Sequence, residues 1–192
     1  MSDRKNEFNA DDLFLNRWSP RAMTGGPITD EQLFSLFEAA RWAPSSHNNQ
    51  PWRFVYAKRD TEYWNKIFNF LVEGNRLWVK NAAAIVVVIS KTISEYNGSF
   101  IRTHSFDTGA AWENIALQGT ISGLVIHGMS GLDYEKATEE LGLPEEFKVE
   151  MMFAVGLPGN EDELPDKLRE IEKPSGRKEI SEIVSEGVFS FD

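Results

Sequence analysis

The pattern of apolar positions along the chain predicts several strands separated by helices. Residues 82–89 form a continuous apolar run, which is typical of a strand buried on both faces. Residues 147–155 place apolar side chains at alternate positions and predict a strand with at least one apolar face. Aromatic and β-branched residues at 52–57 predict a third strand, and 124–127 predict a short fourth. Residues 183–191 fit either a terminal strand or an arm on a partner.

The clearest helix signal begins at Thr29, a good N-cap residue, and Gln32 three positions later completes a capping box. Pro44 ends this helix. The other predicted helices span residues 10–16, 60–72, 106–121, 133–141 and 162–171. The helix at 106–121 contains small residues such as Gly119, and it is therefore expected to pack closely on another helix or on a sheet.

Four or five strands separated by helices predict an α/β or α+β domain with a sheet covered by helices. The 192 residues, 41% of them hydrophobic, fit one domain with a sizeable core. No repeat or long Pro/Gly linker divides the chain, so residues 1–192 are expected to form a single domain.

Charge and composition exclude several functions. A net charge of −10 argues against a general nucleic-acid binder, because phosphate backbones attract clustered Lys and Arg. The absence of cysteine excludes disulfides, Cys-ligated iron–sulfur clusters and thiol catalysis. The longest apolar stretch is far shorter than the roughly 20 residues of a membrane span, and the N-terminus carries no apolar signal region. We therefore expect a soluble cytoplasmic protein with no membrane partner.

Several familiar catalytic signatures are missing from the sequence. It has no G-x-G-x-x-G after a strand, no P-loop and no G-x-S-x-G elbow. His47, His104 and His127 fall at no metal-ligand spacing, so no metal site is expected.

Two segments remain as candidates for binding. Arg17-Trp18-Ser19-Pro20-Arg21 offers two guanidinium groups and a hydroxyl, which suit a phosphate, although paired surface arginines often make only ordinary ion pairs. Residues 43–52 form a polar loop stiffened by Pro44 and Pro51. Such a loop can be a solvated connection, or its amides and hydroxyls can bind the edge of a planar, polar heterocycle.

Together these motifs closely resemble the nitroreductase family of flavoproteins. The resemblance rests on Arg-x-Ser-x-Arg near the N-terminus and on Ala-Pro-Ser-Ser-x-Asn-x-Gln-Pro-Trp-x-Phe after the next helix. Later segments are also similar: the helix beginning at Asp107, the turn at residues 128–133, the strand end at 154–158 and a late arginine, Arg177. The resemblance implies an α+β nitroreductase-like fold, a mostly antiparallel sheet covered by helices, and a homodimer with one FMN in each of two interface pockets.

Carried over by position, the resemblance implies that Arg17, Ser19 and Arg177 hold the FMN phosphate. Arg21 would lie near the pyrimidine edge of the flavin ring, where positive charge stabilises the reduced, anionic form. Trp18 lies within the first motif and is counted with the cofactor-binding residues, although core packing is the preferred role for Trp18 and for Trp52.

The flavin ring would be lined by Pro44, Ser45, Ser46 and Asn48, with Asn48 reaching across the dimer interface. Ser130 and Gly131 match the turn whose backbone N–H approaches the reactive N5 atom, and Asn75 matches a further ring-contacting asparagine. Many relatives have an acidic residue where this chain has Ser130. His47 lies where the family varies and receives no catalytic role.

The resemblance implies a ping-pong oxidoreductase that takes hydride from NAD(P)H through flavin N5 and gives it to a small-molecule acceptor such as a nitroaromatic or a quinone. No protein acid, base or nucleophile is required, because the cofactor carries the chemistry. Two alternatives stay open: another flavin reaction on the same fold, such as dehalogenation or flavin consumption, and a non-catalytic flavin-binding protein.

Overall fold

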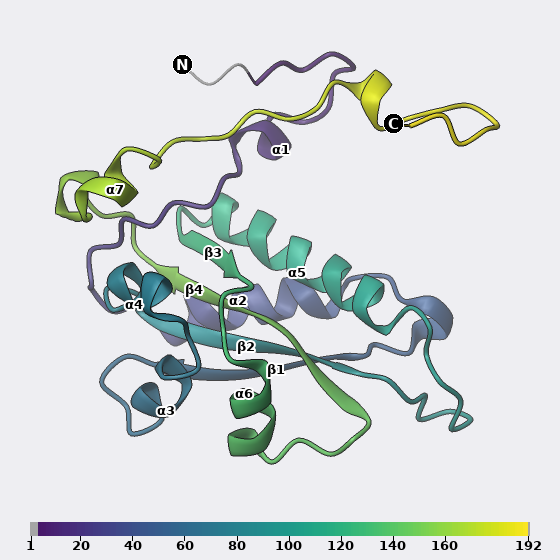
Figure 1. The fold of residues 1–192 in the computed structure, drawn as a ribbon, viewed down its shortest axis with the longest axis horizontal. Helices are drawn as coiled ribbons and strands as arrows, with labels where there is room; N and C mark the ends of the chain where they lie inside the picture. The colour runs from purple at the N-terminus through teal and green to yellow at the C-terminus, as the bar shows by residue number, and fades with distance from the viewer. Residues whose placement is uncertain (1–3, 192) are drawn as a thin grey trace.

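The computed structural model describes residues 4–191 and shows one sheet with helices on both faces (Figure 1). The strands are β1 (Trp52–Lys58), β2 (Ala84–Lys91), β3 (Val125–Met129) and β4 (Phe147–Gly156). The α-helices are α1 (Asp12–Asn16), α2 (Asp30–Arg41), α3 (Trp64–Phe68), α4 (Glu73–Val79), α5 (His104–Ile121), α6 (Tyr134–Leu141) and α7 (Asp166–Arg169). Short 3₁₀ turns lie at η1 (Ser46–Asn48), η2 (Glu161–Glu163) and η3 (Ile180–Glu182).

The four strands form one antiparallel sheet in the order β1-β2-β4-β3. β2 lies inside the sheet and is buried along nearly all of its length, as its apolar run predicts. The pairing of β2 with β4 shifts where Val88 faces Met151 and Ile89 faces Val149, which leaves Glu150 as a bulge. The α+β class with an antiparallel sheet is therefore confirmed.

Two hydrophobic clusters cover the two faces of the sheet, because successive strand residues point to opposite sides. Helices α2 and α5 contribute Leu33, Leu36 and Ile115 to one cluster, together with Val86 and Phe153 of the sheet. On the other face, α3 and α4 pack Trp64, Ile67, Trp78 and Val79 against Ile85, Val87 and Met152. Trp52 belongs to the first cluster, so its predicted core role is confirmed.

The capping box at the start of α2 is also confirmed. The Gln32 backbone N–H donates to Thr29 Oγ1 at 3.1 Å, and the Thr29 N–H donates to Gln32 Oε1 at 2.9 Å. On α5, a Cβ built at Gly119 would lie 2.1 Å from Ile126 Cγ1, so only glycine permits this approach of the helix to β3. The close packing predicted from the small residues of this helix is therefore observed.

Two predicted helices were wrong in extent, and one helix was missed. The helix expected over 60–72 is reduced to α3, because Leu71 bridges to Leu132 and the Val72 N–H donates to the Gly131 carbonyl. These tertiary bonds end the helix, and α4 begins directly afterwards, which the sequence pattern missed because Gly74 and Asn75 are poor helix formers. The helix expected over 162–171 is only α7, preceded by η2.

The N-terminal segment and the segment after α7 run side by side above the sheet (Figure 1). Beyond η3 the chain extends away from the body as an arm, and within residues 183–191 the structure contains no strand. The terminal strand is therefore not formed within these residues, and a role for the extended segment as an arm on a partner stays a prediction. Along the described residues, every helix is too short or too polar to span a bilayer.

Candidate functional site

The Arg17–Arg21 segment is a short loop held between α1 and the end of β4. Arg17 caps α1, and its N–H donates to the Leu13 carbonyl. After the loop, Met23 bridges to Pro158 and the Thr24 N–H donates to the Leu157 carbonyl at 3.1 Å. The loop is thereby fixed at both ends.

A buried carboxylate, Glu172, holds the far end of this loop. Its Oε1 accepts hydrogen bonds from the backbone N–H groups of Arg21, at 2.5 Å, and Ala22, at 2.9 Å. Its Oε2 lies 3.3 Å from Arg21 Nη1, and the Glu172 side chain is only 2% exposed. The sequence carries no local signal for Glu172, because this residue lies in a charged stretch typical of solvated surface and is 151 positions from its partner.

Five basic side chains converge on a cavity of about 310 Å³ beside this loop. Its lining consists of Arg4, Arg17, Trp18, Ser19, Arg21, His127, Ile171, Lys173, Ser175 and Arg177. Arg17 Nη1 donates to Ser19 Oγ at 3.3 Å, which aligns the two groups that the sequence predicts for a phosphate. We call this space the cationic cavity; its lining includes all three predicted phosphate-binding residues. Trp18 is half-buried and lines the cavity rather than the core.

His127 connects the loop to the sheet. It lies on β3 and packs against Trp78 with the two rings tilted by 47° and their centroids 4.5 Å apart, and its Nδ1–H donates to the Pro20 carbonyl at 2.8 Å. Burial lowers the pKa of His127, the hydrogen bond to Pro20 opposes this shift, and the Arg21 charge adds to it. The imidazole therefore favours its neutral form, with the proton on Nδ1.

A second cavity of about 400 Å³ adjoins the cationic cavity. Arg17 and Ser19 line both spaces, and the second one continues over Gly128, Met129 and Ser130 of β3 and its following turn. Trp112 and Glu113 of α5 and Met151 of β4 complete its lining. We call it the ring cavity. The two cavities meet at Arg17 and Ser19, and together they run from a strongly basic end to an end with fewer charged residues.

The turn at Ser130–Gly131 is held from behind by α4. Asn75 Nδ2 donates to the Gly131 carbonyl at 3.0 Å, and Tyr134 Oη donates to the Ser130 carbonyl at 3.2 Å. A Cβ at Gly131 would lie 2.7 Å from Asn75 Nδ2 and 3.0 Å from Val72 Cγ2, so a larger residue cannot fit without movement. The structure thus brings Asn75 into contact with the Ser130–Gly131 turn, although Asn75 and Gly131 lie 56 positions apart in the sequence.

The polar loop between Pro44 and Pro51 has a strained backbone. His47, Asn48 and Gln50 have φ values of 51°, 54° and 46°, a region that side chains with a Cβ seldom adopt. The buried Asp107 Oδ2 accepts from the Ser46 N–H at 3.1 Å, Ser45 Oγ accepts from the Gln50 N–H, and Ser94 Oγ donates to Asn49 Oδ1 at 2.7 Å. Backbone strain that is maintained in this way is common at binding sites.

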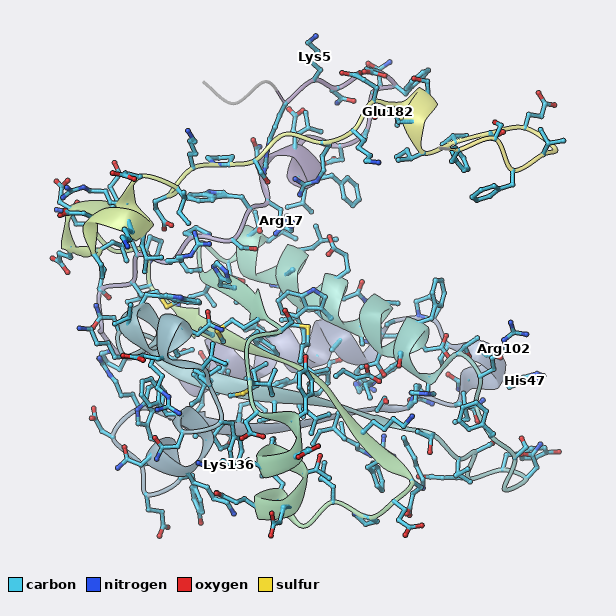
Figure 2. All side chains as sticks on the ribbon, viewed as in Figure 1. Lys5, Arg17, His47, Arg102, Lys136 and Glu182 are labelled. Carbon is cyan, nitrogen blue, oxygen red and sulfur yellow. The ribbon has the colours of Figure 1, made fainter. Side chains whose placement is uncertain are left out.

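Within one chain, this loop does not reach the cationic cavity. Ser46 and His47 instead line a different cavity of about 610 Å³, shared with the loop that carries Tyr96, Phe100 and Arg102. Figure 2 shows Arg17 above the sheet and His47 at the opposite end of α5. The predicted ring-lining residues, Pro44, Ser45, Ser46 and Asn48, are therefore separated from the other predicted site residues.

The fold and the cavities define an α+β protein of the nitroreductase type, and comparisons with known proteins agree. The model of the nitroreductase family matches residues 15–76. A provisionally named NADH dehydrogenase/NAD(P)H nitroreductase of Archaeoglobus fulgidus is 32% identical over 153 residues, which cover 78% of this chain and 85% of that protein. The chain belongs to the nitroreductase family.

Solved structures extend the similarity over the whole chain. The crystal structure of an oxidoreductase containing FMN is 43% identical, with a TM-score of 0.94, and the match covers 100% of this chain and 98% of that one. A provisionally named nitroreductase from Desulfovibrio desulfuricans, solved in complex with FMN, shares the fold at a TM-score of 0.73 and 23% identity, covering 93% and 96% of the two chains.

Proposed function

We propose that this protein is an FMN-dependent oxidoreductase that uses NAD(P)H to reduce a small organic acceptor such as a nitroaromatic or a quinone. The observation that carries the proposal is the pair of adjoining cavities that share Arg17 and Ser19. One cavity is strongly basic, and the other ends at the Ser130 turn. This arrangement fits a ligand with a phosphate at one end and a planar ring at the other, and the similar FMN-containing oxidoreductase supports the same ligand.

Arg17, Ser19 and Arg177 are the groups best suited to bind the phosphate. Guanidinium groups bind phosphate through paired donors, and these two arginines form no ion pair with a carboxylate among the described residues. Arg21 differs, because Glu172 already compensates its charge. We assign Arg21 to the pyrimidine edge of the ring, and Trp18 to the wall of the cationic cavity between the two ends.

FMN, when bound, would supply the hydride-transfer chemistry between NAD(P)H and the acceptor. The protein's own residues would bind the FMN and orient it. Asn75 and Tyr134 hold the carbonyls of Gly131 and Ser130, so the backbone of this turn beside the ring cavity is held in place. Ser130 places a neutral side chain there, which leaves Glu113 as the carboxylate lining the ring cavity.

A second copy of the chain is proposed to complete the site. Within one chain, Pro44, Ser45, Ser46 and Asn48 line neither of the two cavities that contain Arg17, which supports their contacting the flavin from another subunit. The arm beyond η3 also exposes Ile183, Val184, Val188 and Phe189, the last at 87%. Large exposed apolar residues on an extended segment are typical of a subunit interface. We therefore propose a homodimer with one FMN in each of two interface sites.

The absorption spectrum of the purified protein tests the proposal. We expect a flavin spectrum, directly or after FMN is added and excess removed, and bleaching of that spectrum by anaerobic NADPH or NADH. Continued oxidation of the nicotinamide with a nitroaromatic, while the flavin remains intact, supports the reductase. Consumption of the flavin identifies another flavin reaction, and flavin that binds without being reduced identifies a binding protein. A protein that binds no FMN contradicts the proposal altogether.

A further inference from the structure

We propose that Arg4, which lies outside the Arg-x-Ser-x-Arg motif, is a further phosphate-binding residue and holds the other phosphate ligands in place. The inference rests on the proposed FMN site and adds a residue to it. Arg4 belongs to the segment before α1, and its guanidinium lines the cationic cavity beside Arg17 and Arg177.

Three hydrogen bonds place the Arg4 guanidinium between the two segments that form the cavity. Nη1 donates to the carbonyls of Leu15 and Arg17, the latter at 2.9 Å. Nε donates to the Ser175 carbonyl at 2.9 Å, on the segment that leads to Arg177. One planar side chain therefore joins the loop that carries Arg17 to the segment that carries Arg177, and it fixes both relative to each other.

These bonds leave one donor group for a ligand. Among residues 4–191, the Arg4 Nη2 group donates to no protein acceptor, whereas Nε and Nη1 are both engaged. A guanidinium held through two of its nitrogens has lost most of its conformational freedom, so the third can bind an anion at a small entropic cost.

The positive charges around the cavity also favour the binding of an anion. Burial lowers the pKa of Arg4, and the charges of Arg177 and Arg17 lower it further, so the three guanidinium groups repel one another. Among residues 4–191, no carboxylate lines this cavity, and the neighbouring Glu172 is engaged with Arg21. A phosphate dianion among Arg4, Arg17 and Arg177 offsets this repulsion. A ligand without a phosphate leaves the repulsion in place.

The comparison of FMN with riboflavin separates this role from a general structural one. Riboflavin has the same ring and ribityl chain but no phosphate. If Arg4 binds the phosphate and positions its ligands, Arg4→Ala weakens FMN binding about ten- to hundredfold, while the dissociation constant for riboflavin changes by less than about threefold. If Arg4 only stabilises the fold, both ligands lose affinity to the same extent.

The experiment measures dissociation constants of the flavin-free full-length protein for FMN and riboflavin by quenching of flavin fluorescence. Arg4→Gln serves as a second variant if Arg4→Ala does not fold, because the amide can still donate to a carbonyl without carrying a charge. Lys5→Ala is the matched control: it removes the adjacent exposed charge, and Lys5 does not line the cationic cavity. The control is expected to keep wild-type affinity for both ligands.

A selective loss of FMN binding supports the inference, and an equal loss for both ligands or no loss for either overturns it. The proposed function is judged separately on the wild-type protein. If the wild-type protein binds FMN and the Arg4 variant binds it with the same affinity, only the role of Arg4 is contradicted. Wild-type protein that binds neither flavin removes the proposed function and this inference with it.

Discussion

Arg17 and Arg21 lie in the same five-residue loop, but the structure gives them different surroundings. Among the described residues, the Arg17 guanidinium donates a hydrogen bond only to Ser19, and Arg17 lines both cavities. Arg21 is paired with a carboxylate that is almost fully buried. The motif therefore presents one arginine whose charge is available to an anion and one whose charge is already compensated. Substitution of the two residues should have different effects.

Arg17→Ala is expected to weaken FMN binding by about 1.5–3 kcal/mol, because it removes a charge-assisted hydrogen bond to the phosphate. The dissociation constant should rise about ten- to 150-fold, as measured by fluorescence titration of the flavin-free protein. Arg41→Ala, at an exposed ion pair on α2, provides the control. Unchanged affinity for FMN in the Arg17 variant would mean that Arg17 is an ordinary surface residue.

The depressed pKa of His127 predicts a dependence of stability on pH. Because the unfolded chain binds a proton near pH 6.5 and the folded chain does so only at lower pH, the contribution of His127 to stability is present above pH 6.5 and is lost as the pH falls below it. The free energy of unfolding of the wild type should therefore fall more steeply between pH 7 and pH 5 than that of His127→Gln. Denaturant titrations at several pH values test this, and identical slopes would contradict it.

At the scale of elements, α5 organises both halves of the site. Asp107, near its N-terminus, accepts a hydrogen bond from the polar loop, and Trp112 and Glu113, further along, line the ring cavity. Near its C-terminus, Gly119 lets the helix approach Ile126, one residue before His127 on β3. The position of this helix therefore fixes the polar loop, the ring cavity and β3 relative to one another.

Gly119→Ala should destabilise the protein by about 1–3 kcal/mol, because the new methyl group overlaps Ile126 at a tightly packed contact. Gly109→Ala on the same helix is the matched control, since a Cβ there meets no atom within 4 Å. Removing the flexibility of glycine inside a helix should stabilise the control by roughly 0.5–1 kcal/mol. Chemical denaturation of both variants measures the difference, and equal effects would refute the close contact.

Asp107→Ala should loosen the polar loop, because the Ser46 N–H loses its acceptor. Amide exchange across residues 45–50 is expected to accelerate about tenfold, as measured by mass spectrometry. Thr108→Val is the control at the next residue, since Thr108 Oγ1 is buried and has no hydrogen-bond partner among the described residues. Exchange that is the same in the Asp107 variant and the wild type would show that the loop is held by its other contacts.

At the scale of the whole molecule, the separation of Arg17 from Asn48 allows a test of the proposed dimer. Arg17→Ala and Asn48→Ala chains each damage both sites of their own homodimer. When the two chains are mixed and re-associated, each heterodimer regains one site with both residues intact. Random mixing should restore tight FMN binding at about a quarter of all sites.

Flavin content after gel filtration, together with the mass of the complex by light scattering, measures the outcome. A monomeric mass, or a mixture that binds no more FMN than the two separate variants, would contradict the shared site. Mixing each variant with itself controls for the effect of re-association.

The sequence alone determined the local chemistry and most of the elements. A buried strand requires a continuous apolar run, and a capped helix requires Thr29 and Gln32, so both could be read from neighbouring residues. The resemblance to the nitroreductase family pointed to Arg17, Ser19 and Arg177, and the structure places all three around one cavity.

Only the tertiary structure decided the partners of these residues. Glu172 contacts a loop 151 positions away, Arg4 joins segments from the two ends of the chain, and the bridge of Leu71 to Leu132 ends a helix that its local pattern would continue. Such contacts depend on which distant segments the tertiary fold brings together, and short-range sequence patterns carry no information about this. For the same reason, the sequence could name the Pro44–Asn48 loop but could not show that one chain holds it apart from Arg17.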